Sequence, residues 1–384
     1  MDNYTFYSPT RFVFGKGQEN TVGALCKAEG AHKVMIVYGG GSVVKSGLLS
    51  RVKASLDGEG LAYCEHGGVQ PNPRVADVRE GIAQAREEDV DFLLAVGGGS
   101  CIDAAKAIAL GVLYEGDIWD FFCGKATIQK TLPTGCILTL AAAGSEGSTN
   151  MVLTNEELCI KAGAGSDLLR PVFAVLNPEL TYTLPPYQTA CGVTDIFMHV
   201  VERYFTNSTD GYLMDELCES IFRTMVKYGP KVMADPEDYN ARAQIMWGGM
   251  IAHNNTCAIG RVQDWASHGI QSPIGALYDS AHGAGLATVC PAWMRYVYKH
   301  DVARFVRFAT NVFGVENDVY DPEGVALEGI ARTKAFFKSL GMPVTLSELG
   351  VRDEDLDFLC KGRTTGNFVK LQEEDIRAIY ELAR

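Results

Sequence analysis

The sequence lacks the features that direct a chain to a membrane or into an oxidising compartment. Its first ten residues, MDNYTFYSPT, hold no basic segment followed by an apolar stretch, so no signal peptide is expected. It has no run of 18 apolar residues, so we expect no transmembrane helix. The 11 cysteines occur singly and form no Cys-x-x-Cys pair, as is typical of reduced cytosolic proteins. We therefore expect a cytoplasmic protein with no membrane partner, no disulfide and no thiolate metal site.

Basic residues are also in short supply. The chain has 34 Lys and Arg against 47 Asp and Glu, a net charge of −13. This balance argues against nucleic acid and anionic membrane surfaces as partners. It does not exclude a phosphorylated cofactor, because backbone N–H groups at the start of a helix can hold phosphate. With 384 residues and 47% hydrophobic content, the chain has enough apolar material for two domains of ordinary size.

Short apolar segments alternate with helical patterns in the first half of the chain. We expect strands at 33–38, 61–66, 91–96, 136–140 and 171–176, with helices from about 46, at 74–88 and at 100–110. Strands that alternate with helices predict parallel βαβ units and a doubly wound sheet. This half is therefore expected to be an α/β domain spanning residues 1–185.

The second half changes character, because helical periodicity dominates and strand signals disappear. The expected helices include 190–205, 212–228, 239–253 and 327–340. The boundary is placed near Leu184-Pro185-Pro186, since prolines end one element and readily open the next helix. Residues 186–384 are therefore expected to form an all-α domain.

Two strands end in glycine-rich turns that lead into helices. The turn Gly97-Gly98-Gly99-Ser100 lets the backbone approach an anion, and the following helix start supplies free N–H groups. The spacing is not Gly-x-Gly-x-x-Gly, so the alternative interpretation, a tight turn that binds no ligand, remains possible from the sequence. The first turn, at 38–42, holds Gly39, Gly40, Gly41 and Ser42 but none of the acidic residues that usually bind the ribose 2′-hydroxyl of NAD. Because Lys45 is nearby, this turn favours NADP as the cofactor, and NAD is the alternative. It also remains open whether Lys45 is only a solvated surface charge.

A small set of histidines suggests a metal site. Asp195 and His199 are four residues apart in a helical segment, so their side chains share one face. His268 and His282 lie 14 apart, about 21 Å on an unbroken helix, which is too far to share an ion. We expect a break near Pro273, Gly275 and Tyr278-Asp279, so that two helices bring both rings together. Oxygen and nitrogen ligands without sulfur suit Fe(II), Zn, Co or Mn. The alternative to a metal site is that these histidines are ordinary core residues and that the Asp-x-x-x-His pair occurs by chance.

With these residues in view, the chain resembles the iron-containing (group III) alcohol dehydrogenases, and among them the NADPH-dependent butanol dehydrogenase and aldehyde reductase branch. The similarity spans nearly the whole chain. It includes FGKG at 14–17, YGGGS at 38–42, PNPR at 71–74, GGGS at 97–100 with Asp103, GSE at 144–146 and NPEL at 177–180. Its most specific part is the ordered set of GVTD at 192–195, His199, His268 and His282.

The resemblance implies an N-terminal dinucleotide-binding domain, a C-terminal metal-binding domain and a homodimer. It implies a divalent metal, Fe(II) or Zn, on the catalytic ligands Asp195, His199, His268 and His282. The implied cofactor contacts are Gly39, Gly40, Gly41, Ser42, Asn72, Gly97, Gly98, Gly99, Ser100, Asp103, Thr139, Leu140, Ser148 and Lys161. Two positions depart from the family: Ser272 stands where a second histidine is frequent, and Ala143 where a threonine is frequent.

The expected activity is hydride transfer between NAD(P)H and a small aldehyde or primary alcohol. The ion would polarise the carbonyl oxygen, and the cofactor would deliver hydride. Water, a cofactor ribose hydroxyl and Tyr278 are candidate proton donors. Trp265, Tyr278 and Phe197 either line an apolar pocket or belong to the core. Two alternatives are a dehydroquinate synthase-like lyase, for which basic residues such as Arg203 and Arg261 are few, and a non-catalytic nucleotide-binding protein.

Overall fold

The computed structural model describes residues 1–158 and 160–384 and divides into two compact units. The first, here the α/β unit, is Tyr7–Thr183. The second, here the helical unit, is Leu184–Arg384 together with Met1–Phe6. The N-terminal segment belongs with the helical unit because its backbone bonds there: the amide of Asp2 donates to the carbonyl of Gly260 at 3.0 Å.

The α/β unit is built on a parallel sheet, which confirms the predicted fold class. Among the described residues the sheet has six strands in the order β1-β8-β5-β4-β2-β3. Every residue of the central strand β4 is buried, because helices cover both faces of a parallel sheet of this kind. The strand bounds are β1 Arg11–Phe14, β2 Lys33–Gly39, β3 Ala62–Val69, β4 Phe92–Gly97, β5 Thr134–Leu138 and β8 Phe173–Leu176.

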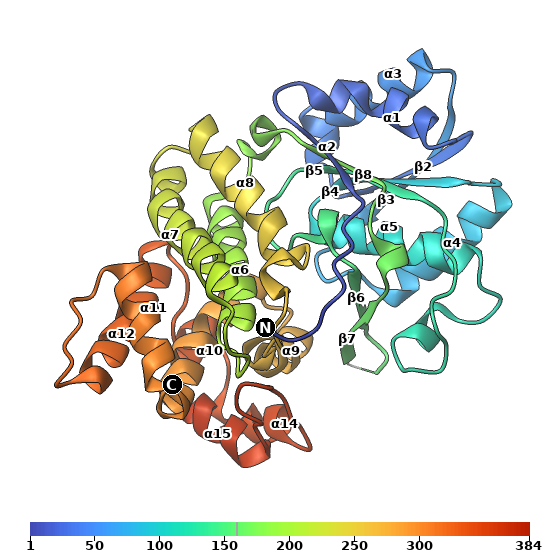
Figure 1. Cartoon of the computed structure of the whole chain (residues 1–384). Helices are drawn as coiled ribbons and strands as arrows, with labels where there is room; N and C mark the ends of the chain where they lie inside the picture. The colour runs from blue at the N-terminus through green and yellow to red at the C-terminus, as the bar shows by residue number, and fades with distance from the viewer. Residues whose placement is uncertain (159) are drawn as a thin grey trace. The chain divides into compact units, whose positions relative to one another are not determined.

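Helices lie on the two faces of this sheet (Figure 1). On one face α1 (Val22–Ala28) and α3 (Leu48–Gly58) pack their buried residues against β2 and β4 in one hydrophobic cluster. On the other face lie α4 (Val75–Glu87) and α5 (Gly99–Val112), which also pack on each other. The short helix α2 (Ser42–Lys45) follows β2 directly. Short 3-10 helices are η1 Gln18–Thr21, η2 Ile118–Phe121, η3 Ser145–Gly147, η4 Asp167–Leu169 and η5 Pro178–Thr181.

The α/β unit also contains an antiparallel hairpin that the sequence patterns do not predict. It consists of β6 (Asn150–Asn155) and β7 (Ile160–Gly165), paired from Asn150↔Gly165 to Asn155↔Ile160. The sequence of β7 is IKAGAG, in which small residues hide the alternation that marks a strand. Cross-strand pairing with β6, which is largely buried, supplies the stability that the local sequence does not.

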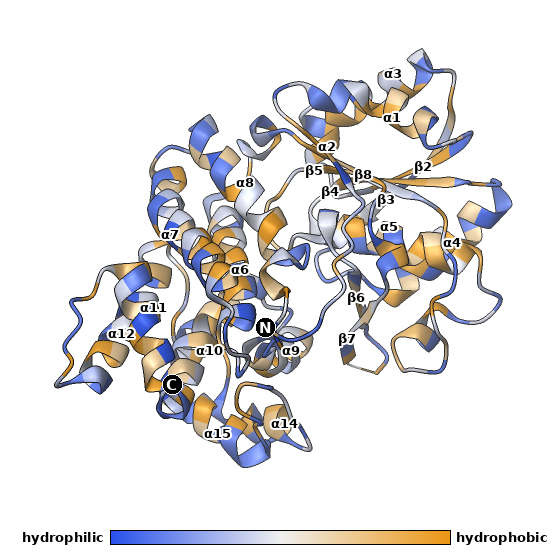
Figure 2. Cartoon of the chain, in the orientation of Figure 1, coloured by the Kyte–Doolittle hydropathy of each residue, from blue (hydrophilic) through white to orange (hydrophobic). Residues whose placement is uncertain are grey.

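Helices make up the other unit, and α6 lies at its centre, in contact with α7, α8 and α10. Much of β2 and α6 consists of hydrophobic residues, whereas much of α7 and α12 consists of hydrophilic residues (Figure 2). Helix α12 begins earlier than predicted because Asp321 accepts the amide proton of Gly324 at 2.9 Å and so caps the helix start. The helix bounds are α6 Pro186–Tyr204, α7 Tyr212–Ala234, α8 Tyr239–His253, α9 Ala266–Tyr278, α10 His282–Val297, α11 Val302–Phe313, α12 Pro322–Ser339, α13 Leu346–Leu349, α14 Leu356–Cys360 and α15 Glu373–Leu382.

None of the helices in the described part of the chain combines the length and apolar character that crossing a bilayer requires.

Candidate metal centre and nucleotide turns

Helix α6 carries two of the predicted metal ligands. Pro186 opens the helix at a position where its missing N–H costs nothing, and the segment from Gly192 onward is buried throughout. Asp195 and His199 lie one turn apart on this buried helix, and each is only 4% exposed. The predicted i, i+4 arrangement is therefore present: the Nε2 atom of His199 lies 3.5 Å from Oδ1 of Asp195.

The other two histidines lie on two helices that meet at a tight turn. His268 is in the first turn of α9, and His282 is the first residue of α10. Asp279 ends α9 with a φ of 48° and reverses the chain. The predicted break between His268 and His282 is confirmed: it lies at residues 279–281, and α9 continues through Pro273 and Gly275 to Tyr278. A proline inside a helix removes one backbone hydrogen bond, and Pro273 is buried within α9.

The four side chains converge on one carboxylate oxygen. From Oδ1 of Asp195, the Nε2 atom of His268 is 3.9 Å away and that of His282 is 3.7 Å away. The ligand atoms of Asp195, His268 and His282 lie within 4.8 Å of one another. The Nε2 atoms of His199 and His268 are buried and make no hydrogen bond to any described residue. Buried nitrogens that face a carboxylate in this way fit a divalent cation, which takes nitrogen and oxygen donors of this kind.

The partners of the opposite ring nitrogens orient two of the histidines. Glu202 Oε1 lies 2.6 Å from Nδ1 of His268, and Gln271 Oε1 lies 2.7 Å from Nδ1 of His282. In each pair the Nδ1–H group donates a hydrogen bond to the oxygen, so the Nε2 lone pair is left for a metal. His199 differs, because its Nδ1 faces the Arg203 guanidinium at 3.1 Å, and that contact does not select the same tautomer.

Electrostatics keep His199 neutral. Burial lowers the pKa of His199 well below its ordinary value, and the nearby His253, His268, Arg203 and His282 lower it further. Neutral imidazole is the form that coordinates a metal, so His199 carries no imidazolium charge that would oppose a cation near neutral pH. This environment therefore favours metal binding over protonation.

A glycine sets the distance between α6 and α10. A Cβ atom at Gly283 would lie 2.2 Å from the carbonyl oxygen of Cys191, so any side chain there would collide with the backbone of α6. The residue next to His282 must therefore be glycine for α10 to approach α6 this closely. The sequence shows this glycine directly after His282, but its packing role appears only in the structure.

The two glycine turns lie at the same edge of the sheet. Tyr38 of β2 pairs with Val96 of β4, so both parallel strands end side by side. Strand β3 lies on the opposite side of β2 from β4, which makes this edge the topological switch point where doubly wound sheets bind ligands. Helix α5 begins at Gly99, within the second turn, so that its N-terminal amides lie at the turn as a phosphate cradle requires. Gly40, Gly41 and Ser42 of the first turn are exposed.

Further predicted cofactor residues of the α/β unit lie beside the second glycine turn or beside one another. The amide of Thr139 donates to the carbonyl of Gly97 at 3.0 Å, and a Cβ atom at Gly98 would lie 3.2 Å from that of Leu140. Lys161 of β7 donates to Oδ1 of Asn72 at 2.9 Å. The segment at 139–140 therefore lies beside the turn at 97–98, and Lys161 lies beside Asn72.

Two other predicted cofactor residues bind the segment that contains η3 and the start of β6. Asp103 accepts hydrogen bonds from Ser145 Oγ at 2.5 Å and from the amide of Val152 at 3.0 Å. Ser148 is 2% exposed and lies against Lys106, whose ammonium group donates to the carbonyls of Ser145, Ser148 and Asn150 at 2.7, 3.1 and 2.9 Å. Lys106 is not among the predicted residues, although Asp103 and Lys106 share one face of α5 at i, i+3 spacing.

Both halves of the chain match one known protein family. Residues 9–178 match the family described as iron-containing alcohol dehydrogenase, and residues 189–384 match the C-terminal part of the Fe-containing alcohol dehydrogenase family. The chain belongs to the iron-containing alcohol dehydrogenases.

Individual members of the family are similar over their full length. The chain is 42% identical over 386 residues to the probable NADH-dependent butanol dehydrogenase 2 of Bacillus subtilis (strain 168), with 99% of each chain covered. It is 37% identical over 393 residues to the NADPH-dependent aldehyde reductase YqhD of Escherichia coli (strain K12), with 100% of each covered. The crystal structure of NADH-dependent butanol dehydrogenase A from Thermotoga maritima matches with a TM-score of 0.96 and 42% identity, covering 100% of this chain and 99% of that one.

Family membership confirms the predicted enzyme class. The protein is an oxidoreductase of the alcohol dehydrogenase and aldehyde reductase type, which the comparisons favour over a lyase or a non-catalytic nucleotide-binding protein. Its relatives include NADH-dependent and NADPH-dependent enzymes, so the family supports a nicotinamide cofactor of either kind together with a divalent metal.

The structure gives the surroundings of three aromatic residues whose roles the sequence left open. Phe197 is fully buried among other phenylalanines, with ring centroids 4.5 Å from Phe222, and therefore belongs to the core. The hydroxyl of Tyr278 hydrogen-bonds to Asp355 and accepts the amide proton of Arg352 at 3.0 Å, so it is held by protein partners. Trp265 packs edge-on against His199 and His268, at 5.9 and 5.0 Å between centroids, and so belongs to the candidate metal centre of this dehydrogenase.

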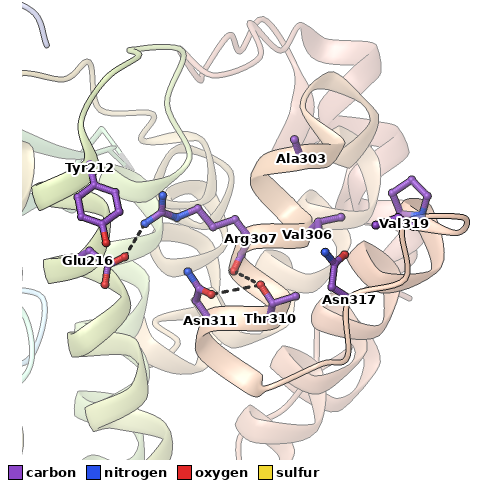
Figure 3. Close-up of a pocket in the computed structure, with 10 residues that line it drawn as sticks. Tyr212, Glu216, Ala303, Val306, Arg307, Thr310, Asn311, Asn317 and Val319 are labelled. Carbon is purple, nitrogen blue, oxygen red and sulfur yellow. Dashed lines mark hydrogen bonds and ion pairs between the residues drawn. The ribbon is translucent and has the colours of Figure 1, made fainter.

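A surface pocket of about 580 Å³ lies between α7, α11 and the start of α12 (Figure 3). Arg307 pairs with Glu216 at 3.0 Å, and Thr310 donates to the Arg307 carbonyl at 3.1 Å, so polar groups of the lining bind one another. It contains none of the residues singled out for dehydrogenase chemistry. The lining residues are Tyr212, Glu216, Ala303, Val306, Arg307, Thr310, Asn311, Asn317, Val319 and Pro322.

Proposed function

We propose that this enzyme reduces small aliphatic aldehydes such as butanal to primary alcohols, with NADPH preferred over NADH. The observation that carries this proposal is the convergence of three imidazole Nε2 atoms on Oδ1 of Asp195, at 3.5, 3.9 and 3.7 Å. Relatives described as butanol dehydrogenases and as an aldehyde reductase support the substrate class. We also propose that the enzyme is a homodimer in solution.

Asp195, His199, His268 and His282 would hold the metal ion. Three neutral imidazoles and one carboxylate leave a net positive charge at a bound divalent cation. A cation of this kind polarises a carbonyl oxygen as a Lewis acid and so makes the carbonyl carbon more electrophilic. Fe(II) and Zn both accept this ligand set, and Fe(II) is our first choice because of the family.

The residues of the glycine turns would hold the cofactor, which supplies the hydride. The exposed turn at 39–42 has no carboxylate, and the Lys45 side chain passes within 3.7 Å of the Cβ position of Gly41. A cationic side chain over a turn of exposed amides suits a ribose 2′-phosphate, whereas NAD-binding turns usually end near an acidic residue. Asn72 and Lys161 would contact the cofactor directly, while Asp103 and Ser148 would act through the segment that they hold.

The test is a coupled metal and activity measurement. Metal-stripped protein would be reloaded with Fe(II) or with Zn²⁺, and NADPH oxidation would be followed with a series of aldehydes. We expect turnover with butanal only after reloading, and a higher kcat/KM with NADPH than with NADH. Reloaded protein that binds metal but oxidises neither NADPH nor NADH with any aldehyde would refute the proposal. Light scattering of the same sample would show whether the enzyme is a dimer.

A further inference from the structure

A fully buried carboxylate lies directly behind one of the candidate metal ligands. Glu202 is on α6, three residues after His199, and its residue is 0% exposed. Its Oε1 atom lies 2.6 Å from Nδ1 of His268 and also accepts the backbone amide proton of His268 at 3.0 Å. One carboxylate oxygen therefore fixes both the ring and the main chain of the same residue.

The backbone contact explains part of this arrangement. His268 lies in the first turn of α9, where amide protons have no partner within the helix. Trp265 precedes the helix and provides no side-chain cap, so Glu202 supplies the acceptor from another helix. A neutral acceptor would serve this capping role as well, so capping alone does not require a charge.

The ring contact gives the charge a role. A carboxylate is costly to bury, and within the described part of the chain the side chain that Glu202 contacts at hydrogen-bond distance is the His268 ring. A negative charge beside Nδ1 keeps the ring proton on that nitrogen and makes Nε2 a stronger electron-pair donor to a metal ion. The partners at Nδ1 of the three histidines differ in charge: a carboxylate at His268, a neutral amide at His282 and a guanidinium at His199.

We propose that Glu202 is a positioning residue that holds His268 as the Nδ1–H tautomer and, through its negative charge, makes it the strongest imidazole ligand of the centre. The proposal rests on the metal site proposed above. It predicts that the charge of Glu202 contributes to metal affinity beyond the hydrogen bond that it makes.

Two variants separate the charge from the hydrogen bond. Glu202→Gln retains an oxygen acceptor without charge, and Glu202→Ala removes both. We expect Zn²⁺ affinity, measured by competition with a chelator on the full-length protein, to fall about 10- to 100-fold in Glu202→Gln and further in Glu202→Ala. The absorption spectrum of the Co²⁺-loaded protein should shift in Glu202→Gln.

A matched control is Glu219→Gln. Glu219 is also fully buried in the helical unit, but it bonds Tyr204, Arg307 and Asn311 instead of a candidate ligand. The Zn²⁺ affinity of the Glu219→Gln variant should equal that of the wild type. Thermal unfolding of each metal-free variant shows whether the fold is retained. Equal losses of affinity in both glutamine variants would overturn the proposal, because the effect would then reflect loosening of the unit.

The His268→Ala variant separates failure of this inference from failure of the metal site. If His268→Ala loses Zn²⁺ but Glu202→Gln and Glu202→Ala bind it as tightly as the wild type, the metal site stands and the role of Glu202 is wrong. If His268→Ala binds Zn²⁺ as the wild type does, the proposed site itself is wrong.

Discussion

The ammonium group of Lys161 donates a hydrogen bond to the side-chain oxygen of Asn72, 2.9 Å away, across 89 positions of sequence. Asn72 has a φ of 55°, in the left-handed region that asparagine tolerates better than most residues. Lys161 lies on the hairpin strand β7, which the sequence did not predict. This contact joins two of the predicted cofactor residues within one unit.

Replacing Lys161 with alanine should weaken cofactor binding and leave the metal in place. A charge-assisted hydrogen bond contributes about 1.5–3 kcal/mol, so KM for NADPH should rise about tenfold or more. Initial rates at varied NADPH, together with metal analysis, test this. An unchanged KM would show that Lys161 serves only to hold Asn72. Lys125, an exposed lysine of the same unit, is the control position for substitution by alanine.

Replacing His268 or His282 with alanine should remove metal and abolish turnover while the fold survives. Each change deletes one imidazole from the set that faces Asp195. Metal content per chain, activity and circular dichroism would be measured on the same sample. His32→Ala is the control, because His32 is exposed and pairs with Asp91 at 3.1 Å. Full metal content in His268→Ala would contradict the ligand assignment.

Replacing Gly40 with aspartate should reverse the cofactor preference. A Cβ atom at Gly40 meets nothing within 4 Å, so the new side chain fits. Its carboxylate would repel a 2′-phosphate and accept a hydrogen bond from a ribose hydroxyl, lowering kcat/KM for NADPH by about tenfold or more. Gly40→Ala controls for the loss of glycine. A wild-type enzyme that prefers NADH would refute the proposed preference.

Replacing Gly283 with alanine should destabilise the helical unit. The added methyl group would lie 2.2 Å from a backbone oxygen of α6, and overpacking of this kind costs about 1–3 kcal/mol. Chemical denaturation of the metal-free protein measures the free energy of unfolding. Gly58→Ala, at the end of α3 where a Cβ atom has open space, should be neutral or slightly stabilising. Equal effects of the two changes would show that the α6–α10 contact is not tight.

Stability should depend on pH through Glu146. Burial raises the pKa of its carboxyl group to about 7 from an ordinary value of 4.5, although its own backbone amide and Lys106 lower it. Between these two values the folded chain keeps a proton that the unfolded chain has released, so the free energy of unfolding falls as pH rises. In Glu146→Gln this loss should be smaller, by up to about 3 kcal/mol across the window. Denaturation curves from pH 4.5 to 8 test this, with the exposed Glu87→Gln as control.

Periodicity and spacing predicted much of the architecture, because the responsible patterns are local. Alternating strands and helices indicated the parallel sheet, and the i, i+4 spacing placed Asp195 beside His199. The sequence indicated a break between His268 and His282 but not its exact place, because α9 runs through Pro273 as far as Tyr278. Glu202 and Gln271 were not found, because their partners lie 66 and 11 positions away and no spacing rule connects them. Contacts of this kind depend on how helices pack, which a single sequence does not show.

The division of the chain into two units has a practical consequence for diagnosing inactive variants. Every candidate metal ligand belongs to the helical unit, and every candidate nucleotide residue belongs to the α/β unit. Metal content and NADPH binding can therefore be titrated separately, and each titration reports on one unit. An inactive variant that has lost NADPH binding but binds metal in full has its defect in the α/β unit, and one that has lost metal but binds NADPH in full has its defect in the helical unit.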